Sequence, residues 1–118
     1  MIFKLVFTIL LFLIHTASAA EEPPKPFITD GCSNFFDGGF SDSEQWLDCC
    51  TEHDLAYWRG GSKQERLLAD QKFKQCIAER ANPILAELMY RAVRLFGHPH
   101  NHADYRWGYG YAYGDGYR

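Results

Sequence analysis

The positions of the cysteines constrain the fold of this chain more than any other feature. The sequence of 118 residues contains four of them: Cys32, Cys49, Cys50 and Cys76. An even number of cysteines in a short exported chain is typical of a domain held by disulfides, and here it predicts two. Zinc is the other common use of four cysteines, but the sequence has no C-x-x-C pair. The spacing therefore favours two disulfides over a zinc site.

The N-terminus has the pattern of a secretory signal peptide, which fits an oxidising compartment. A short basic start precedes an apolar run over residues 5–14, and residues 17–19 form an A-x-A cleavage signal. The apolar run is shorter than the roughly 20 residues that a membrane-spanning helix needs. We predict a signal peptide over residues 1–19, cleavage near Ala19 or Ala20, no transmembrane segment in the mature protein, and a secreted or periplasmic location.

Length and charge limit the classes of function. A chain of 118 residues has room for one domain, and its formal net charge is −3. Binding to nucleic acid needs a clustered basic surface, so we expect no nucleic acid partner. We divide the mature chain into a proline-rich arm (residues 20–29), one folded domain (residues 30–97) and a tail rich in histidine, glycine and tyrosine (residues 98–118). The oligomeric state stays open.

Capping signals predict that the folded domain is all-α. We expect three helices, each running from a capping signal towards a glycine or a proline: from near Ser41 to Trp58, from Ser62 to about Arg80, and from Asn82 to about Phe96. The first two starts are Ser-x-x-Glu capping boxes. The third is Asn-Pro, in which asparagine caps the helix and proline suits the first helical position. Apolar residues at helical spacing make the third helix amphipathic.

The short link between the first two helices predicts that they are antiparallel neighbours. In an antiparallel pair, the residue numbers of two positions that face each other add up to a nearly constant sum. The sums for Cys49 with Cys76 and for His53 with Asp70 are nearly equal, so both pairs fit one alignment of the helices. Adjacent cysteines strain badly when bonded to each other. Because Cys49 shares the helical stripe of His53, we pair Cys49 with Cys76, which leaves Cys32 to bond Cys50.

An imidazole and a carboxylate lie next to each other on the first helix. Cys49, His53 and Tyr57 are four residues apart and share one stripe, while Asp54 lies on the adjacent stripe with Cys50. His53 and Asp54 therefore point to nearly the same place. An isolated histidine or tyrosine here would be typical of a hydrogen-bonded core residue, whereas the whole set favours a catalytic site.

The pattern Cys-Cys-x-x-His-Asp-x-x-Tyr, followed by Asp-x-x-x-x-x-Cys, resembles the signature of the secreted phospholipase A2 family. Residues 49–76 carry this match, and residues 30–33 are similar to the start of the calcium loop in the shorter bacterial and fungal members. The resemblance implies a calcium-dependent enzyme that cleaves the sn-2 acyl ester of glycerophospholipids at a membrane or micelle surface. It also implies a fold with two antiparallel catalytic helices, a calcium-binding loop and a third amphipathic helix.

The resemblance assigns a role to each residue of the motif. His53 would take a proton from the attacking water, and Asp70 would fix the imidazole tautomer. Tyr57 would hydrogen-bond to Asp70 and orient it. These three side chains are the expected catalytic and supporting residues.

The resemblance also implies a Ca²⁺ site, which would stabilise negative charge on the ester oxygen. Asp54 would supply a carboxylate to it. The remaining ligands would be loop carbonyls, which by family position lie near Gly31, Ser33 and Phe35.

Some features depart from the animal enzymes of that family. The calcium loop contains less glycine, the N-terminal helix that lines the substrate channel is missing, and the β-wing between the catalytic helices is missing as well. We expect the third helix to wall the acyl channel instead, through Leu85, Leu88, Met89 and Phe96. The irregular loop supports a second hypothesis, a catalytically inactive module that binds lipid or a protein. A third is ester hydrolysis or acyl transfer on another substrate.

The tail allows two interpretations. Its Trp and Tyr side chains, Trp107, Tyr109, Tyr111, Tyr113 and Tyr117, suit the headgroup level of a lipid surface. Its glycines suit a mobile tail equally well. The histidines at positions 98, 100 and 102 are more typical of a solvated loop than of a closed metal site.

Overall fold

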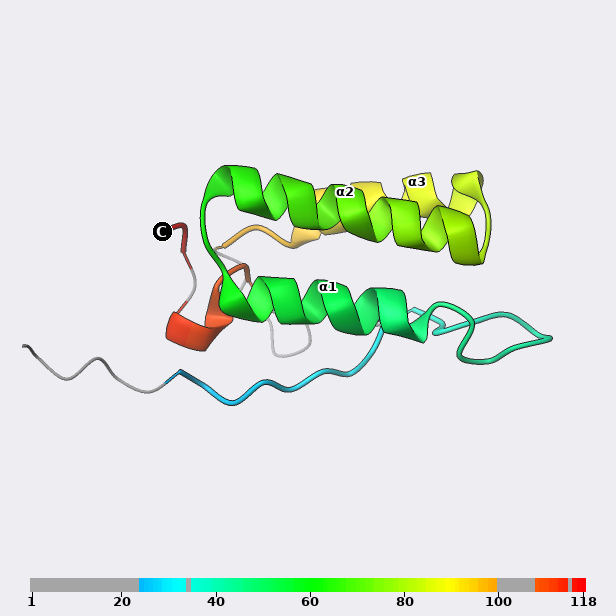
Figure 1. Ribbon diagram of the computed structural model, residues 1–118, viewed down its shortest axis with the longest axis horizontal. Coiled ribbons are helices and arrows are strands. Elements are labelled where there is room, and N and C mark those ends of the chain that lie inside the picture. Colours follow the sequence, from blue (N-terminus) through cyan, green and yellow to red (C-terminus); the bar gives the residue numbers. More distant parts are fainter. Residues whose placement is uncertain (1–23, 34, 100–107, 115) are drawn as a thin grey trace, which may run out of the picture.

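The computed structural model describes residues 24–33, 35–99, 108–114 and 116–118, so the predicted signal peptide lies outside the described residues. Three α-helices make up the described domain: α1 (Leu47–Arg59), α2 (Lys63–Arg80) and α3 (Pro83–Phe96). A short 3-10 helix, η1 (Tyr111–Tyr113), follows near the C-terminus. α1 and α2 run antiparallel, and α3 packs along α2 (Figure 1). The prediction of an all-α, disulfide-linked domain is confirmed.

The caps of α2 and α3 form as the sequence predicts. The side chain of Ser62 accepts a hydrogen bond from the backbone N–H of Glu65 at 3.1 Å. The side chain of Asn82 accepts one from the N–H of Leu85 at 2.8 Å, with proline at the first helical position. Each cap satisfies a backbone donor that the first turn leaves unpaired.

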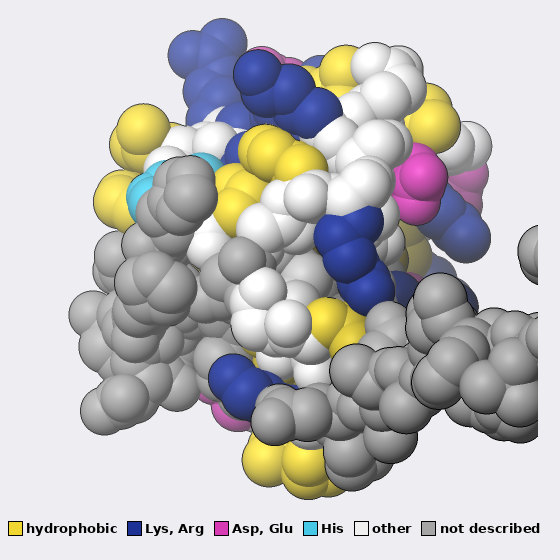
Figure 2. Space-filling model, turned by 90° about the vertical axis from the view of Figure 1, so that its left-hand side faces the viewer, with side chains coloured by type: hydrophobic (Ala, Val, Ile, Leu, Met, Phe, Trp, Pro, Cys, Tyr) yellow, Lys and Arg dark blue, Asp and Glu magenta, His cyan; other side chains and the backbone are white. Residues whose placement is uncertain are grey.

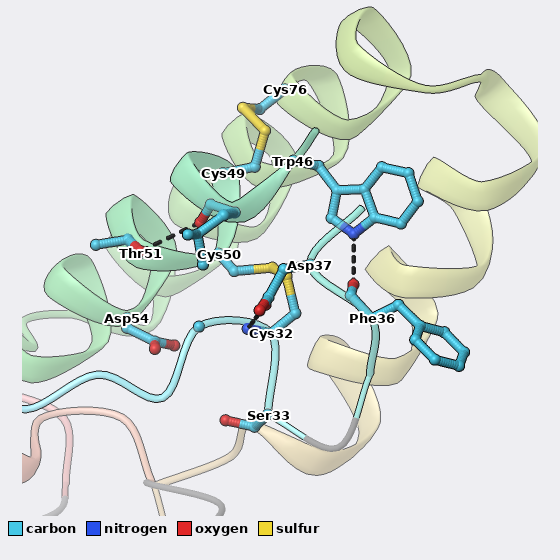
Figure 3. The surroundings of a disulfide bond; sticks show 12 residues. Cys32, Ser33, Phe36, Asp37, Trp46, Cys49, Cys50, Thr51, Asp54 and Cys76 are labelled. Carbon is cyan, nitrogen blue, oxygen red and sulfur yellow. Dashed lines mark hydrogen bonds between the residues drawn. A yellow bond between two sulfur atoms is a disulfide. The ribbon is translucent and has the colours of Figure 1, made fainter. Parts of the chain in front are cut away.

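The predicted start of the first helix is wrong, because α1 begins at Leu47 and not near Ser41. Trp46 explains the difference. Its backbone N–H donates to the carbonyl of Asp37 at 2.9 Å, and its indole N–H donates to the carbonyl of Phe36 at 2.6 Å (Figure 3). An α-helix through this position would need that backbone N–H for the carbonyl four residues back. The loop has taken it, so the chain makes turns up to residue 46.

Both predicted disulfides are present in the structure. Cys49–Cys76 joins α1 to α2, with 5.7 Å between the Cα atoms, and Cys32–Cys50 joins the preceding loop to α1, with 5.0 Å (Figure 3). They lie in a small core that also contains Trp46 from before α1. Buried side chains from α2 and α3 complete this core: Phe73, Ile77, Ala86 and Met89.

The described part of the tail packs against the end of α1, which neither interpretation of the tail predicts. Tyr109 is 1% exposed and Tyr111 is 9% exposed, and both pack with Tyr57. These two side chains are therefore not available to a lipid surface. Figure 2 shows this end of the molecule, where hydrophobic side chains are scattered between basic ones. Trp107 and the histidines at positions 100 and 102 lie outside the described residues.

Within the described ranges, no helix is both long enough and apolar enough to span a bilayer.

Candidate functional site

A hydrogen bond between the first two helices forms the centre of the site. His53 on α1 and Asp70 on α2 approach each other in the predicted register, with 2.7 Å between Nε2 and Oδ1. Asp70 is completely buried and His53 is 8% exposed. Phe73 and Tyr57 flank the imidazole ring, with centroids 4.5 Å and 4.3 Å away. Because Asp70 occupies Nε2, Nδ1 is the ring nitrogen left for chemistry.

Asp70 accepts hydrogen bonds on both carboxylate oxygens. The Tyr57 hydroxyl donates to Oδ1 at 2.7 Å, as predicted, and Nη1 of Arg94 donates to Oδ2 at 2.6 Å. Burial alone would raise the pKa of Asp70, but the donors around it, above all His53, outweigh burial and hold that pKa below its ordinary value. The carboxylate therefore stays ionised inside the protein.

Tyr57 stays a hydrogen-bond donor throughout. Burial and the neighbouring charge of Asp70 raise the pKa of its hydroxyl far above the ordinary value. A protonated hydroxyl keeps donating to the carboxylate at every physiological pH, which supports the predicted supporting role.

Two arginines complete this network, and the sequence analysis missed both. Arg94 comes from α3, and nothing in the sequence marks its contact with α2. Arg66 is 4% exposed, and its Nε lies 3.9 Å from Oδ2 of Asp70 and donates to the Tyr57 hydroxyl at 3.0 Å. Its position four residues before Asp70 was the available signal, because residues with that spacing share a helix face.

Asp54 lies on the adjacent stripe of α1 in a different environment. Its carboxylate extends towards the loop (Figure 3), where the Thr29 hydroxyl donates to Oδ2 at 2.7 Å. Burial raises the pKa of Asp54 to about 7, the hydrogen bond from Thr29 opposes the rise, and the charge of Asp30 adds to it. Within the described residues, no Lys or Arg side chain forms an ion pair with this carboxylate. A partly buried carboxylate of this kind is suited to bind a cation.

The loop before α1 is shaped around Gly31 and Asp37. Gly31 has φ +72°, and a Cβ atom there would lie 2.6 Å from Oδ1 of Asp37. The same oxygen accepts a hydrogen bond from the N–H of Cys32 at 3.0 Å. Glycine is needed here both for the backbone conformation and for the space.

This region offers the oxygen ligands that suit a hard cation, but only a few of them come from side chains. Ca²⁺ prefers oxygen ligands. No backbone N–H among the described residues donates to the predicted ligand carbonyls, those of Gly31, Ser33 and Phe35. No group of three His, Cys, Asp or Glu side chains in the described ranges could hold a metal ion. A cation here would therefore depend on Asp54 and loop carbonyls.

All of the predicted catalytic, supporting and metal-binding residues except the buried Asp70 line one cavity of about 290 Å³. The loop and α1 form one wall, with Gly31, Ser33, Phe35, His53, Asp54 and Tyr57. α3 contributes an apolar wall with Met89, Ala92, Val93 and Phe96, and Tyr111 from η1 also lines the cavity.

Two of the four α3 residues expected to form the channel wall do not line the cavity. Leu85 packs against the core, and Leu88 is 61% exposed. Leu88 lies on the outer side of the helix, whereas Met89 and Phe96 take the predicted place. The cavity therefore combines an imidazole, a partly buried carboxylate and an apolar wall.

Comparisons with protein-family models, with curated proteins and with solved structures found no match for this chain. The functional assignment therefore depends on the geometry of the site.

Proposed function

We propose that this protein is a calcium-dependent phospholipase A2 of an oxidising compartment, which hydrolyses the sn-2 acyl ester of glycerophospholipids. One observation carries the proposal: His53, which is hydrogen-bonded to the buried Asp70, lines the same apolar-walled cavity as Asp54. A binding module has no need of an oriented imidazole beside a partly buried carboxylate. The two disulfides fit an exported protein.

His53 acts as the general base. Nδ1 takes a proton from a water molecule, whose oxygen bonds to the acyl carbon of the ester. The bond from that carbon to the glycerol oxygen then breaks, and the proton on Nδ1 passes to the leaving oxygen. The products are a fatty acid and a lysophospholipid. Asp70 accepts from Nε2–H throughout, which fixes the tautomer and stabilises the imidazolium.

Ca²⁺, when bound, supplies positive charge beside the ester oxygen, on which negative charge develops. Asp54 and the loop carbonyls near Gly31, Ser33 and Phe35 would hold it. The high pKa of Asp54 supports this assignment, because a cation beside the carboxylate would offset the burial that raises that pKa.

The apolar lining supports the proposal of a lipid ester as the substrate. Met89, Val93 and Phe96 line the same cavity as His53. An acyl chain lying along this wall is removed from water, which contributes roughly 0.8 kcal/mol for each buried CH₂ group.

An inactive module that binds lipid or a protein is the second candidate. It is favoured by the sparse cation site, in which Thr29 already bonds the only carboxylate that lines the cavity in the described residues. Such a module would bind phospholipid without releasing fatty acid.

The deciding experiment is hydrolysis of phosphatidylcholine vesicles whose two acyl chains differ in length. We expect release of the sn-2 chain with calcium and its loss with a chelator, measured by mass spectrometry of the free fatty acids. Binding to vesicles without release would favour the inactive module, and release of the sn-1 chain would contradict the proposed specificity.

His53→Gln tests the base. It removes the proton acceptor while keeping a polar side chain, so we expect kcat to fall by at least about 100-fold with an unchanged melting temperature. His98→Gln makes the same change at an exposed histidine and serves as the matched control. Wild-type activity in His53→Gln would show that the base is wrongly assigned.

A further inference from the structure

The described C-terminal segment, residues 108–114 and 116–118, is attached to α1 and to the link after it by main-chain hydrogen bonds. The N–H of Gly110 donates to the carbonyl of Tyr57 at 2.7 Å, and the N–H of Arg118 donates to the carbonyl of Gly61 at 2.8 Å. A Cβ atom at Gly60 would lie 2.6 Å from Cα of Gly110. The backbones at Gly60 and Gly110 are in contact because neither residue has a side chain. This contact and the two hydrogen bonds fix the position of the segment against the end of α1.

One branch of contacts runs from this segment to Asp54. The buried Tyr111, which lines the cavity, donates its hydroxyl proton to the carbonyl of Ile28 at 3.1 Å. The next residue, Thr29, donates to Asp54 and accepts from the N–H of Gly31 at 3.1 Å. Tyr111 thus fixes the backbone that presents the only hydroxyl bonded to this carboxylate within the described residues.

The arm before the loop is held by the same elements. The N–H of Lys25 donates to the carbonyl of Ala112 at 2.8 Å, and the indole N–H of Trp58 donates to the carbonyl of Lys25 at 2.7 Å. Phe27 packs edge-on against Trp58, with ring centroids 5.9 Å apart. Residues 24–30 belong to no helix or strand, so these contacts set where residue 28 lies.

A second branch runs from the segment to Asp70. Nη1 of the buried Arg66 donates to the Tyr117 hydroxyl at 3.1 Å, and its Nε donates to the Tyr57 hydroxyl. Tyr57 in turn donates to Asp70. Tyr117 therefore helps to orient the guanidinium that orients Tyr57.

We propose that the C-terminal segment is a positioning element of the site. Tyr111 restrains the backbone that holds the Thr29 hydroxyl on Asp54, and Tyr117 helps to orient the hydrogen-bond donors of Asp70. The hydrogen bonds described above connect the segment to both carboxylates through other residues. Its catalytic consequence rests on the proposed function, whereas the positioning itself is measured without substrate.

Tyr111→Phe tests the first branch, because it removes one hydroxyl from a buried ring and keeps its shape. In the full chain we expect the Gly31 amide to exchange with solvent about three to ten times faster, measured by NMR, since the bond from residue 111 no longer restrains the backbone before Thr29. Calcium affinity, measured by calorimetry, should fall by a similar factor. Tyr113→Phe is the matched control, because Tyr113 lies on the same short helix and is 46% exposed.

Tyr117→Phe tests the second branch. We expect the NMR signal of the His53 Nε2 proton, which reports the bond to Asp70, to shift relative to the wild type and to Tyr113→Phe. In the active enzyme, kcat should fall about three- to tenfold with an unchanged KM.

The positioning role is overturned if Gly31 exchange in Tyr111→Phe and the His53 signal in Tyr117→Phe both match the Tyr113→Phe control. If the wild type releases no fatty acid but these two signals change, the proposed activity fails and the positioning role stands.

Discussion

Asp70 bonds the imidazole of His53 and Asp54 lines the same cavity as that ring, and the surroundings of the two carboxylates shift their pKa values in opposite directions. Asp70 accepts from an imidazole, a tyrosine and an arginine, so it stays ionised although it is completely buried. Asp54 has one hydroxyl donor and the anion of Asp30 nearby. Opposite shifts of this kind separate roles in enzymes, and the proposed function uses both carboxylates, Asp70 as the permanent partner of His53 and Asp54 as a cation ligand.

Asp54 makes the stability of the calcium-free protein depend on pH. Its pKa is about 7 in the folded protein against an ordinary value of 3.8. Between these values the folded state holds a proton that the unfolded chain releases, so the free energy of unfolding falls as pH rises from about 4 to about 7 and then levels. In Asp54→Asn this contribution is absent. Urea denaturation in a chelator at pH 5 and pH 8 measures the difference.

Glu52→Gln is the control, because Glu52 is an exposed acid on the same helix. It should keep the wild-type difference in stability between the two pH values. Added calcium should restore stability at pH 8 in the wild type and not in Asp54→Asn. An Asp54→Asn protein with the wild-type pH dependence would mean that this carboxylate is not the group responsible.

At the scale of helices, the sequence predicts what is decided locally and misses what the tertiary structure decides. The caps of α2 and α3 are predictable, because each Ser62 or Asn82 side chain bonds a backbone N–H three residues later. The Ser-x-x-Glu box at Ser41 looks the same in sequence and fails, because the loop carbonyls at residues 36 and 37 bind Trp46 and start the helix there.

The registry of α1 and α2 was predictable for the same local reason. A short connection and two pairs of chemically matched residues fix one antiparallel alignment, and the contact between His53 and Asp70 follows from it. The contacts of Arg94 and Tyr111 join segments distant in sequence, and no periodicity marks them. In the tail, alternating glycine and tyrosine carry no helix or strand period, although its buried rings complete the site.

α3 contributes to the site through Arg94, so a variant of this helix should change catalysis. Arg94→Met removes the donor to Oδ2 of Asp70 but keeps an apolar stem of similar length. We expect kcat to fall about tenfold, because a less restrained Asp70 orients the imidazole less well. The free energy of unfolding should fall by about 1–3 kcal/mol, the cost of one charge-assisted hydrogen bond. Vesicle hydrolysis and urea denaturation measure the two effects.

Arg91→Met is the matched control, since Arg91 is on the same helix, is 77% exposed and bonds only Glu87 among the described residues. It should change neither quantity by more than about 0.5 kcal/mol in free energy. Arg94→Lys should recover part of the lost kcat by restoring a charged donor. Equal activity in Arg94→Met and Arg91→Met would remove Arg94 from the positioning network.

For the molecule as a whole, both disulfides stabilise the fold, and each also restrains a different part of the site. The core that surrounds them is small and is shared by three helices. Cys49–Cys76 closes a loop of sequence separation 27 and ties the two helices of the His53–Asp70 pair. Cys32–Cys50 closes a loop of sequence separation 18. It ties Cys32, which lies between Gly31 and Ser33, to the helix that carries Asp54.

Removing the bridges one at a time should separate these effects. By chain entropy, loss of either bridge lowers the free energy of unfolding by about 3–4 kcal/mol. Calcium affinity should respond differently. Replacing Cys32 and Cys50 by serine frees the loop from α1, so we expect affinity to fall at least about tenfold in calorimetry. Replacing Cys49 and Cys76 leaves the loop attached, so the folded fraction should keep its affinity. Equal losses in both variants would mean that the bridges act on the site only through stability.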